Sequence, residues 1–364
     1  MACVHKIFLV ILFYSVFLQT CVIAKHQVPC YFIFGDSLVD HGNNNRLVTL
    51  AKAVYLPHGI DYSSGPTGRF CNGRTMADFY AEYLGFSSHI PPFASSNGSN
   101  ILRGLNYASA AAGIRSETGH HLGDRITFDQ QLKNHQMTMS SIEETLGGSH
   151  LASAYLKKCF YHVGFGSNDY LNNYFIPAVY ETSSMLTVED FTNDLIQQYS
   201  SQIMTLYNYG ARKVALHGLG PVGCTPYEMS RHSSNDSCVE YINTAVQLFN
   251  LKLKLLVDEF NSDPSLQDAK FTYLNLYDLS MEAIKHPSAF GLKVVNNACC
   301  GTGLHNGALT CLSFEVPCTD RNTYLFWDAY HSTETANKIA ARRTYRAEKP
   351  SDAHPVDIYH LVRL

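Results

Sequence analysis

A serine at position 37 directly follows an apolar run and is the first candidate for covalent chemistry in this chain. Residues 31–34 are apolar and predict a buried strand, which ends at Gly35 and presents Asp36 and Ser37 where a helix could begin. Such a corner exposes the hydroxyl and directs the following backbone N–H groups toward one point. Serine or aspartate at a helix start is often only a cap, so the motif needs partners elsewhere in the chain.

Two later segments supply the partners that a serine nucleophile requires. His331 could accept the hydroxyl proton, and Asp328, three residues earlier, could reach its Nδ1 in a turn and leave Nε2 facing Ser37. Asn168 follows another apolar run, at 160–163, and its amide could donate to an oxyanion without adding charge. Each segment alone could be a plain turn. Their combination with Ser37 favours catalysis.

Five short blocks stand in the order found in the GDSL esterase/lipase family of serine hydrolases, part of the SGNH superfamily, and the chain resembles its plant secreted branch. The blocks include Phe-Gly-Asp-Ser-Leu and Gly-Ser-Asn-Asp, and lie at residues 32–44, 106–109, 166–169, 220–226 and 326–331. The resemblance implies a serine esterase or lipase that hydrolyses acyl esters through Ser37, Asp328 and His331 and an acyl-enzyme intermediate. It implies neither a metal nor an organic cofactor.

The same resemblance implies an oxyanion hole made by the Ser37 N–H, the Asn168 amide and a glycine N–H. Many relatives are glycine-rich in the second block, whereas alanines fill positions 110–112 here, which leaves Gly113 as the expected donor and Gly104 as the alternative. Loops at residues 47–64 and 87–100 are expected to line the substrate pocket.

Two other functions remain compatible with these residues. An acyltransferase would use the same three side chains, with an alcohol replacing water as the acceptor. A catalytically silent extracellular binding protein would retain only the scaffold, although the presence of all four polar catalytic residues argues against it.

The start of the chain predicts export. Residues 5–6 are basic, an apolar run follows at 7–18, and small or β-branched residues precede a cleavage point after Ala24. The apolar run is short for a membrane anchor. We therefore expect a signal peptide at 1–24, one SGNH-type hydrolase domain at 25–364, secretion to the apoplast or cell wall, and no membrane span after signal removal. Asn97 and Asn235 stand in glycosylation sequons.

The net charge bears on the possible partners, and the cysteine content bears on disulfides. The net charge of −4 and the lack of a basic stripe make nucleic acid an unexpected partner. Nine of the eleven cysteines remain after residue 24, so disulfides and at least one free thiol are expected. Cys224 could pair with Cys238. The cluster at 299, 300, 311 and 318 favours disulfides of undetermined pairing over zinc, since its spacing matches no common finger.

Alternating apolar and amphipathic segments predict an α/β fold, a three-layer α/β/α sandwich around a mainly parallel five-stranded sheet. Expected strands lie at 31–34, 102–107, 160–164, 213–217 and 271–276, and expected helices at 128–146, 188–209, 239–260, 279–285 and 333–345. The strand order 2-1-3-4-5 is implied by the family alone. Ligands bind at the carboxyl edge of such sheets, which places Ser37 and Asn168 together.

One motif points elsewhere. Gly218, Gly220 and Gly223 match a dinucleotide-binding pattern after a strand, but Pro221 lacks the N–H that a phosphate cradle would use. The chain also has no Gly-x-Ser-x-Gly around Ser37, which argues against the α/β-hydrolase fold.

Overall fold

The structure is a computed structural model that describes residues 26–96, 98, 101–232 and 237–364. The expected signal peptide and the sequon residues Asn97 and Asn235 lie outside the described residues.

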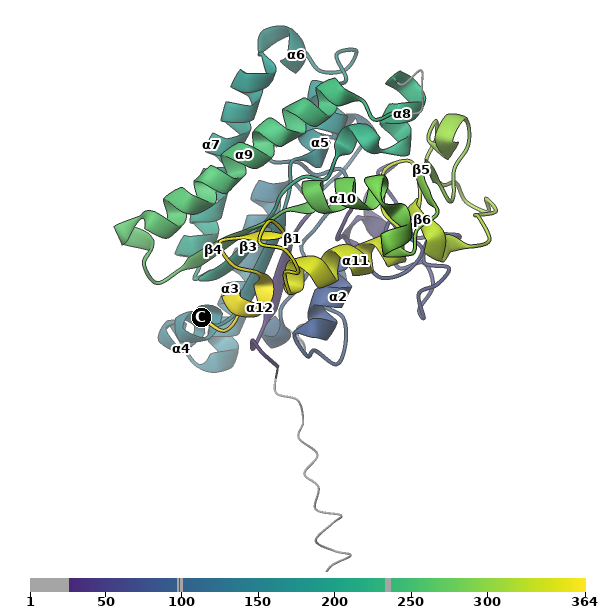
Figure 1. Cartoon of the computed structure of the whole chain (residues 1–364). Helices are drawn as coiled ribbons and strands as arrows, with labels where there is room; N and C mark the ends of the chain where they lie inside the picture. Colours follow the sequence, from purple (N-terminus) through teal and green to yellow (C-terminus); the bar gives the residue numbers. More distant parts are fainter. Residues whose placement is uncertain (1–25, 97, 99–100, 233–236) are drawn as a thin grey trace, which may run out of the picture.

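A sheet lies at the centre of the molecule, between the helices (Figure 1). It has five strands in the order β1-β2-β3-β4-β7, of which the first four are parallel and β7 is antiparallel. Its strands are β1 (Tyr31–Gly35), β2 (Phe160–Gly164), β3 (Lys213–His217), β4 (Lys270–Leu274) and β7 (Ala353–His354). Successive β1 side chains alternate between two cores, as the two-residue period of a strand requires: Phe32 and Phe34 pack into one, Tyr31 and Ile33 into the other.

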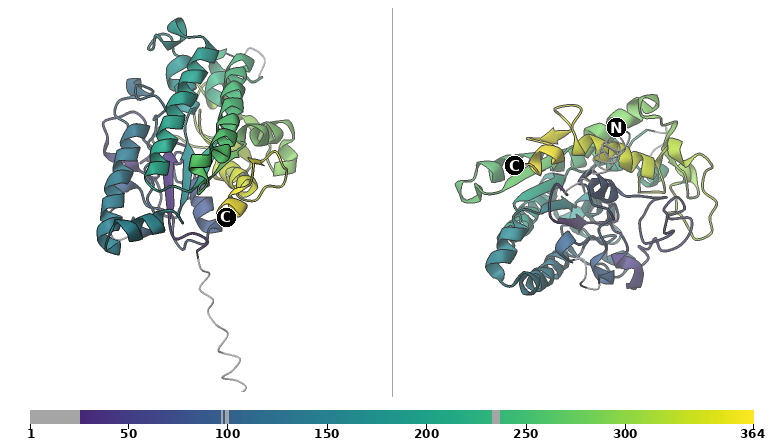
Figure 2. Two further views of the ribbon diagram at one scale, coloured as in Figure 1. Left: turned by 90° about the vertical axis from the view of Figure 1, so that its left-hand side faces the viewer. Right: turned by 90° about the horizontal axis from the view of Figure 1, so that it is seen from below.

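Helices cover both faces of this sheet, which confirms the expected α/β/α sandwich (Figure 2). The first face carries α3 (Phe128–Leu146), α4 (Ser149–Leu156), α7 (Val188–Asn208) and α9 (Glu240–Ser262). The second carries α2 (Met76–Tyr83), α11 (Glu334–Tyr345) and α12 (Ile358–Leu361). The remaining α-helices are α5 (Ser167–Asp169), α6 (Thr182–Met185), α8 (Pro226–His232) and α10 (Leu276–Lys285).

One expected strand, at residues 102–107, is wrong. This segment runs parallel to the free edge of β1 but forms only an isolated bridge there, between Ile33 and Asn106. Backbone hydrogen bonds join Ile33 to Leu105 and Tyr107, and Gly35 to Ser109. No regular strand forms, because Gly104 has a left-handed φ of 101° and the Asn106 backbone bonds Pro91 and Phe93 on its other side. The segment nevertheless occupies the position of the second strand in the order 2-1-3-4-5. The short antiparallel β7 is the fifth strand of the observed sheet.

A separate two-stranded sheet consists of β5 (Val294–Ala298) and β6 (Tyr324–Phe326). It leads into the loop at residues 326–331, the last of the five sequence blocks. Beyond this sheet, the N–H groups of Cys299 and Cys300 continue the pairing to the carbonyls of Phe326 and Trp327. Thr333 then caps α11 by accepting from the Ala336 N–H. The loop that carries Asp328 and His331 is therefore fixed at both ends.

None of the described helices combines the length and the apolar character needed to cross a lipid bilayer.

A buried ion pair anchors the segment between β1 and α2. Arg69 donates from Nε and Nη2 to the two carboxylate oxygens of Asp78, both at 2.7 Å, and both residues are buried. Burial alone would raise the pKa of Asp78, but His41 and Arg69 hold that pKa well below its usual value. Phe70, next to Arg69, packs on the His331 ring at 5.0 Å between ring centroids. This ion pair thus supports one wall of the site.

We expect the Asp78→Asn variant to lose about 3–5 kcal/mol of unfolding free energy, because it leaves the buried Arg69 guanidinium without a counter-charge. Urea denaturation followed by tryptophan fluorescence measures the loss. The matched control is Asp320→Asn, which removes an exposed partner of Lys293 and should cost below about 1 kcal/mol. Equal, small losses for both variants would contradict the structural role given to Asp78.

Candidate active site

Ser37 lies at the carboxyl edge of the sheet, two residues beyond the end of β1. Asn168 lies on the loop after the neighbouring strand β2, and Gly35 pairs with Gly164 across the two strands. Contrary to the expected helix start, residues 36–40 form a turn, in which the Val39 and Asp40 N–H groups both donate to the Asp36 carbonyl. The turn still leaves the Ser37 side chain partly exposed, while Asp36 is buried.

The structure brings Ser37, His331 and Asp328 together in one chain of hydrogen bonds. Ser37 Oγ lies 2.8 Å from His331 Nε2. On the other side of the ring, Nδ1 lies 2.8 and 2.9 Å from the two carboxylate oxygens of Asp328. A proton on Nδ1 would thus be held by the carboxylate, which leaves Nε2 free to accept the serine proton.

The Asp328 carboxylate is fully buried and oriented by its own loop. Its Oδ1 accepts from the backbone N–H groups of Tyr330 and His331, at 2.9 and 2.8 Å. Burial alone would raise the pKa of Asp328, but the facing His331 ring and these hydrogen bonds hold it below its usual value. The group is therefore a carboxylate at neutral pH and can stabilise an imidazolium.

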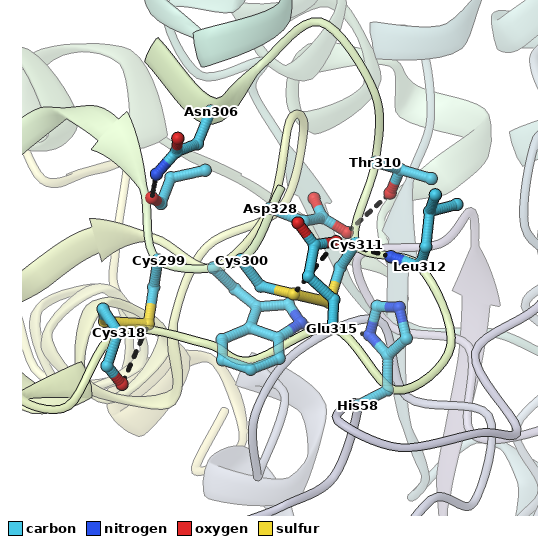
Figure 3. The surroundings of a disulfide bond; sticks show 12 residues. His58, Cys299, Cys300, Asn306, Thr310, Cys311, Leu312, Glu315, Cys318 and Asp328 are labelled. Atoms are coloured by element: carbon cyan, nitrogen blue, oxygen red, sulfur yellow. Dashed lines mark hydrogen bonds between the residues drawn. A yellow bond between two sulfur atoms is a disulfide. The ribbon is translucent and has the colours of Figure 1, made fainter. Parts of the chain in front are cut away.

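Thr310 is a further partner of Asp328 that the sequence blocks did not indicate. Its hydroxyl donates to Asp328 Oδ2 at 3.2 Å. The adjacent Cys311 forms a disulfide with Cys300 (Figure 3). The Cys300 N–H donates to the Trp327 carbonyl at 2.8 Å. Through these contacts the disulfide connects Trp327, which precedes Asp328, to Thr310, which donates to the Asp328 carboxylate. No motif spacing signals this contact, since Thr310 lies in an irregular loop.

A buried histidine, His58, also contacts the loop that carries Asp328. The Trp327 Nε1–H donates to His58 Nδ1 at 3.0 Å, so the proton of a neutral His58 ring stands on Nε2. Burial lowers the pKa of His58 to about 4, which keeps the ring neutral. Tyr55, on the same segment, donates to the Cys311 carbonyl at 3.0 Å.

The Asn168 side chain is held with its amide N–H group toward the site. Its Oδ1 accepts from Asn172 Nδ2 at 2.7 Å, and one Nδ2–H donates to the Ala112 carbonyl at 3.0 Å. The second Nδ2–H remains for another acceptor, and Asn168 lines the same cavity as Ser37.

The glycines expected as the third oxyanion donor do not face this cavity. Gly113 lies against Asp169, whose carboxylate would be 2.6 Å from an added Cβ, and Gly104 packs on the Tyr31 backbone. Neither glycine lines the cavity, whereas Ala110 and Ala111 do. Ala111 has a left-handed φ of 66°, and its N–H meets no acceptor among the described residues.

Buried polar side chains brace the serine turn. Asp36 accepts from the Leu38 N–H, and Asp40 accepts from the N–H groups of Gly42, Asn43 and Ala110. Burial raises the pKa of Asp36 and of Asp40 to about 6.

Gln131 of α3, which no motif marked, clamps the end of β1. Its side chain accepts from the Gly35 N–H at 3.1 Å and donates to the Gly35 carbonyl at 2.9 Å. Gly35, the residue before the Asp36–Ser37 turn, is therefore held at both its N–H group and its carbonyl.

A cavity of about 580 Å³ opens over Ser37 and has mostly apolar walls. Residues 50–52 and His58 line it, as expected for the 47–64 loop. The described residues of the second expected loop, at 87–100, do not line this cavity. They border a separate pocket, together with Tyr62 and Arg69. The walls also include residues of α10 and α11, far from the serine turn in sequence.

Among the cysteines that the structure describes, eight form four disulfides and Cys71 is buried and free. The pairs are Cys30–Cys159, Cys224–Cys238, Cys299–Cys318 and Cys300–Cys311. Cys224–Cys238 is the pair expected from sequence. Cys300, Cys311 and Glu315 offer ligand atoms within 4.8 Å of one another, but the disulfide removes the thiolates that zinc would bind.

The glycine-rich loop after β3 has no free phosphate cradle. The Leu219 and Gly223 N–H groups donate to Asn250 and Asn243 of α9, at 2.7 and 2.9 Å. The loop therefore packs against the helix layer through these hydrogen bonds.

Comparison with known proteins shows the family of this chain. Residues 31–344 match the model of the GDSL-like lipase/acylhydrolase family. The chain belongs to this family. It is 53% identical over 341 residues to GDSL esterase/lipase At1g29670 of Arabidopsis thaliana, covering 94% of this chain and 93% of that protein. Two further Arabidopsis relatives are GDSL esterase/lipase At4g18970, 52% identical over 92% and 93% of the two chains, and GDSL esterase/lipase 7, 47% identical over 93% and 94%. The GDSL chain is accordingly a carboxylic ester hydrolase, and esters or lipids are its class of substrate.

We expect Thr310→Val to lower kcat/KM for a soluble aryl ester about fivefold, the equivalent of roughly 1 kcal/mol for one hydrogen bond to the Asp328 carboxylate. Thr310→Ser keeps the hydroxyl and should restore most of the activity. Steady-state kinetics of both variants provide the measurement. If Thr310→Val matched the wild type, or if both variants lost activity equally, the hydrogen bond would have no catalytic consequence.

Proposed function

We propose that this protein is a secreted serine esterase that cleaves acyl esters through Ser37, His331 and Asp328. The observation that carries the proposal is the 2.8 Å contact between Ser37 Oγ and His331 Nε2, with Asp328 on the opposite ring nitrogen. A serine hydroxyl is a weak nucleophile until a base accepts its proton, and this contact supplies the base.

The proposed reaction has two halves. Ser37 Oγ attacks the ester carbonyl while His331 Nε2 takes its proton, and the resulting imidazolium then protonates the departing alkoxide. An acyl group remains on Ser37. Water attacks that acyl-enzyme with His331 again as the base, which releases the acid and restores the serine.

Three N–H groups would stabilise the oxyanion formed in each half. We assign the Ser37 backbone N–H and the free Nδ2–H of Asn168, as the family resemblance implies. For the third donor, Ala111 is better placed than Gly113, since it lines the cavity and has a free N–H. One such donor is worth on the order of 10²–10³ in kcat.

The cavity supports an ester with an extended apolar acyl chain. Beyond Ser37, its walls include the buried side chains of Leu276, Leu279 and Ala283 on α10 and of Ala336 on α11. Leu292 and Leu325 lie on the same walls. Apolar contacts of this kind favour a hydrocarbon chain over a polar group.

The proposal also includes export of the protein and a single catalytic domain. Residues 1–24 would be removed, residues 25–364 would form one hydrolase domain, and Asn97 and Asn235 would carry glycans. The four disulfides support an oxidising compartment, where such bonds persist.

We expect Ser37→Ala to reduce kcat for p-nitrophenyl butyrate by a factor on the order of 10⁴–10⁶, because the variant lacks the hydroxyl that lies against His331 Nε2. Purified wild type should also be labelled covalently by a fluorophosphonate, and the variant should not. Ser141→Ala, on the exposed surface of α3, serves as the control and should behave as wild type. Equal rates for Ser37→Ala and wild type would dispose of the assignment.

We expect Ala283→Phe to lower kcat/KM for long-chain p-nitrophenyl esters at least about tenfold relative to the acetate, since the larger ring fills the space between α10 and α11. A rate series from acetate to palmitate gives the ratio. Ala289→Phe makes the same change at an exposed position off the cavity and should leave the ratio unchanged. An unchanged ratio in Ala283→Phe would place the acyl chain elsewhere.

A further inference from the structure

Two loops that are distant in sequence lie side by side next to the Ser37 cavity. We call residues 47–60 the first rim loop and residues 304–318 the second rim loop. The Phe314 N–H donates to the Leu56 carbonyl at 3.1 Å, and the Tyr55 hydroxyl donates to the Cys311 carbonyl at 3.0 Å. Both loops border the cavity, through Leu50 and Lys52 of the first and Leu309 and Thr310 of the second.

These rim loops carry unusually few charges for surface segments. Lys52 is the only Lys, Arg, Asp or Glu in the first loop, and Glu315 is the only one in the second, whereas such residues make up 16% of the chain. In their place, large apolar side chains are exposed: Val48 by 82%, Leu50 by 80%, Phe314 by 89% and Val316 by 89%. Smaller exposed fractions occur at Val54, Leu56, Leu304, Leu309 and Leu312.

The one carboxylate in the second rim loop is turned inward. Glu315 Oε2 accepts from the Leu312 N–H at 3.0 Å and lies 3.8 Å from Cys300 Sγ (Figure 3). Its neighbours Phe314 and Val316 are therefore the side chains that reach solvent. Two disulfides, Cys299–Cys318 and Cys300–Cys311, hold the loop, so this exposure belongs to a fixed part of the surface.

A contiguous exposed apolar patch usually marks an interaction site, because leaving it in water is unfavourable. Here the exposed apolar side chains stand on two hydrogen-bonded loops that border the cavity holding Ser37. A second protein copy seated on the patch would obstruct the cavity entrance, whereas a lipid phase seated on it would deliver substrate into the cavity.

We propose that the two rim loops dock the enzyme onto the surface of aggregated lipid ester, with Val48, Phe314 and Val316 inserted among the acyl chains. Adsorption removes these side chains from water and brings the cavity entrance against the phase that contains the ester. The inference rests on the proposed function for its biological meaning, but the adsorption itself requires no catalysis.

The test separates adsorption from hydrolysis by using the inert Ser37→Ala background. The triple substitution Val48→Ser, Phe314→Ser and Val316→Ser is introduced there, and flotation with phosphatidylcholine-stabilised triolein emulsion measures the bound fraction. None of the three residues lines the cavity. The expected result is a fall in the lipid partition coefficient of at least about tenfold, from the loss of three apolar insertions.

A matched control removes three exposed apolar side chains on helices away from the rim loops. Met185→Ser, Leu251→Ser and Leu255→Ser alter α6 and α9, where these residues are exposed by 75%, 57% and 57%. This variant should float as the parent does. In the Ser37-containing enzyme, the rim triple variant should keep its rate on soluble p-nitrophenyl butyrate and lose rate on the triolein emulsion.

Equal flotation of the rim triple variant and its parent would overturn the proposal. So would a parent that does not float, or one whose apolar patch instead holds two copies together, seen as a dimer that the triple variant converts to a monomer. Inactivity of the wild type on soluble esters with normal flotation would reject the proposed function and leave the docking surface standing.

Discussion

The hydrogen bond between Ser37 and His331 is the contact on which the site depends, and it joins residues 294 positions apart in the chain. Neither partner can be placed by its own segment. Ser37 is fixed by the end of β1, and His331 by the small β5–β6 sheet and the cap of α11. The two sheets must therefore hold their relative position closely, because a serine without its base has almost no nucleophilic power.

Buried polar contacts provide that rigidity. Gln131 clamps the end of β1, the Arg69–Asp78 pair anchors the segment that carries Phe70, and Phe70 packs on the His331 ring. A half-satisfied network of this kind would be costly in a low-dielectric interior, so its completeness favours one arrangement of the loops over others. The same low dielectric raises the pKa of Asp36 and strengthens the interaction of Asp328 with His331.

The second rim loop connects the site to the outer surface of the molecule. Thr310 holds the Asp328 carboxylate, and four residues further on Phe314 is almost fully exposed. The Cys300–Cys311 disulfide fixes the inner end of this stretch (Figure 3). The same disulfide-bonded loop thus orients the carboxylate that we propose as catalytic and carries exposed apolar side chains. A lipid phase docked on this loop would lie close to Ser37.

The sequence by itself determined the local elements and the main chemical groups. The helix at 128–146 has the expected bounds, four of the five strands lie where apolar runs predicted them, and Ser37, Asp328 and His331 meet as their motifs suggested. Periodicity and short motifs depend on neighbours within a few residues, so they can be read from the chain. The tertiary structure alone decided that Ala111 rather than Gly113 faces the cavity, that Thr310 supports Asp328, and that Cys300 pairs with Cys311. These outcomes depend on which distant segments pack together, and that packing leaves no periodic mark on the sequence.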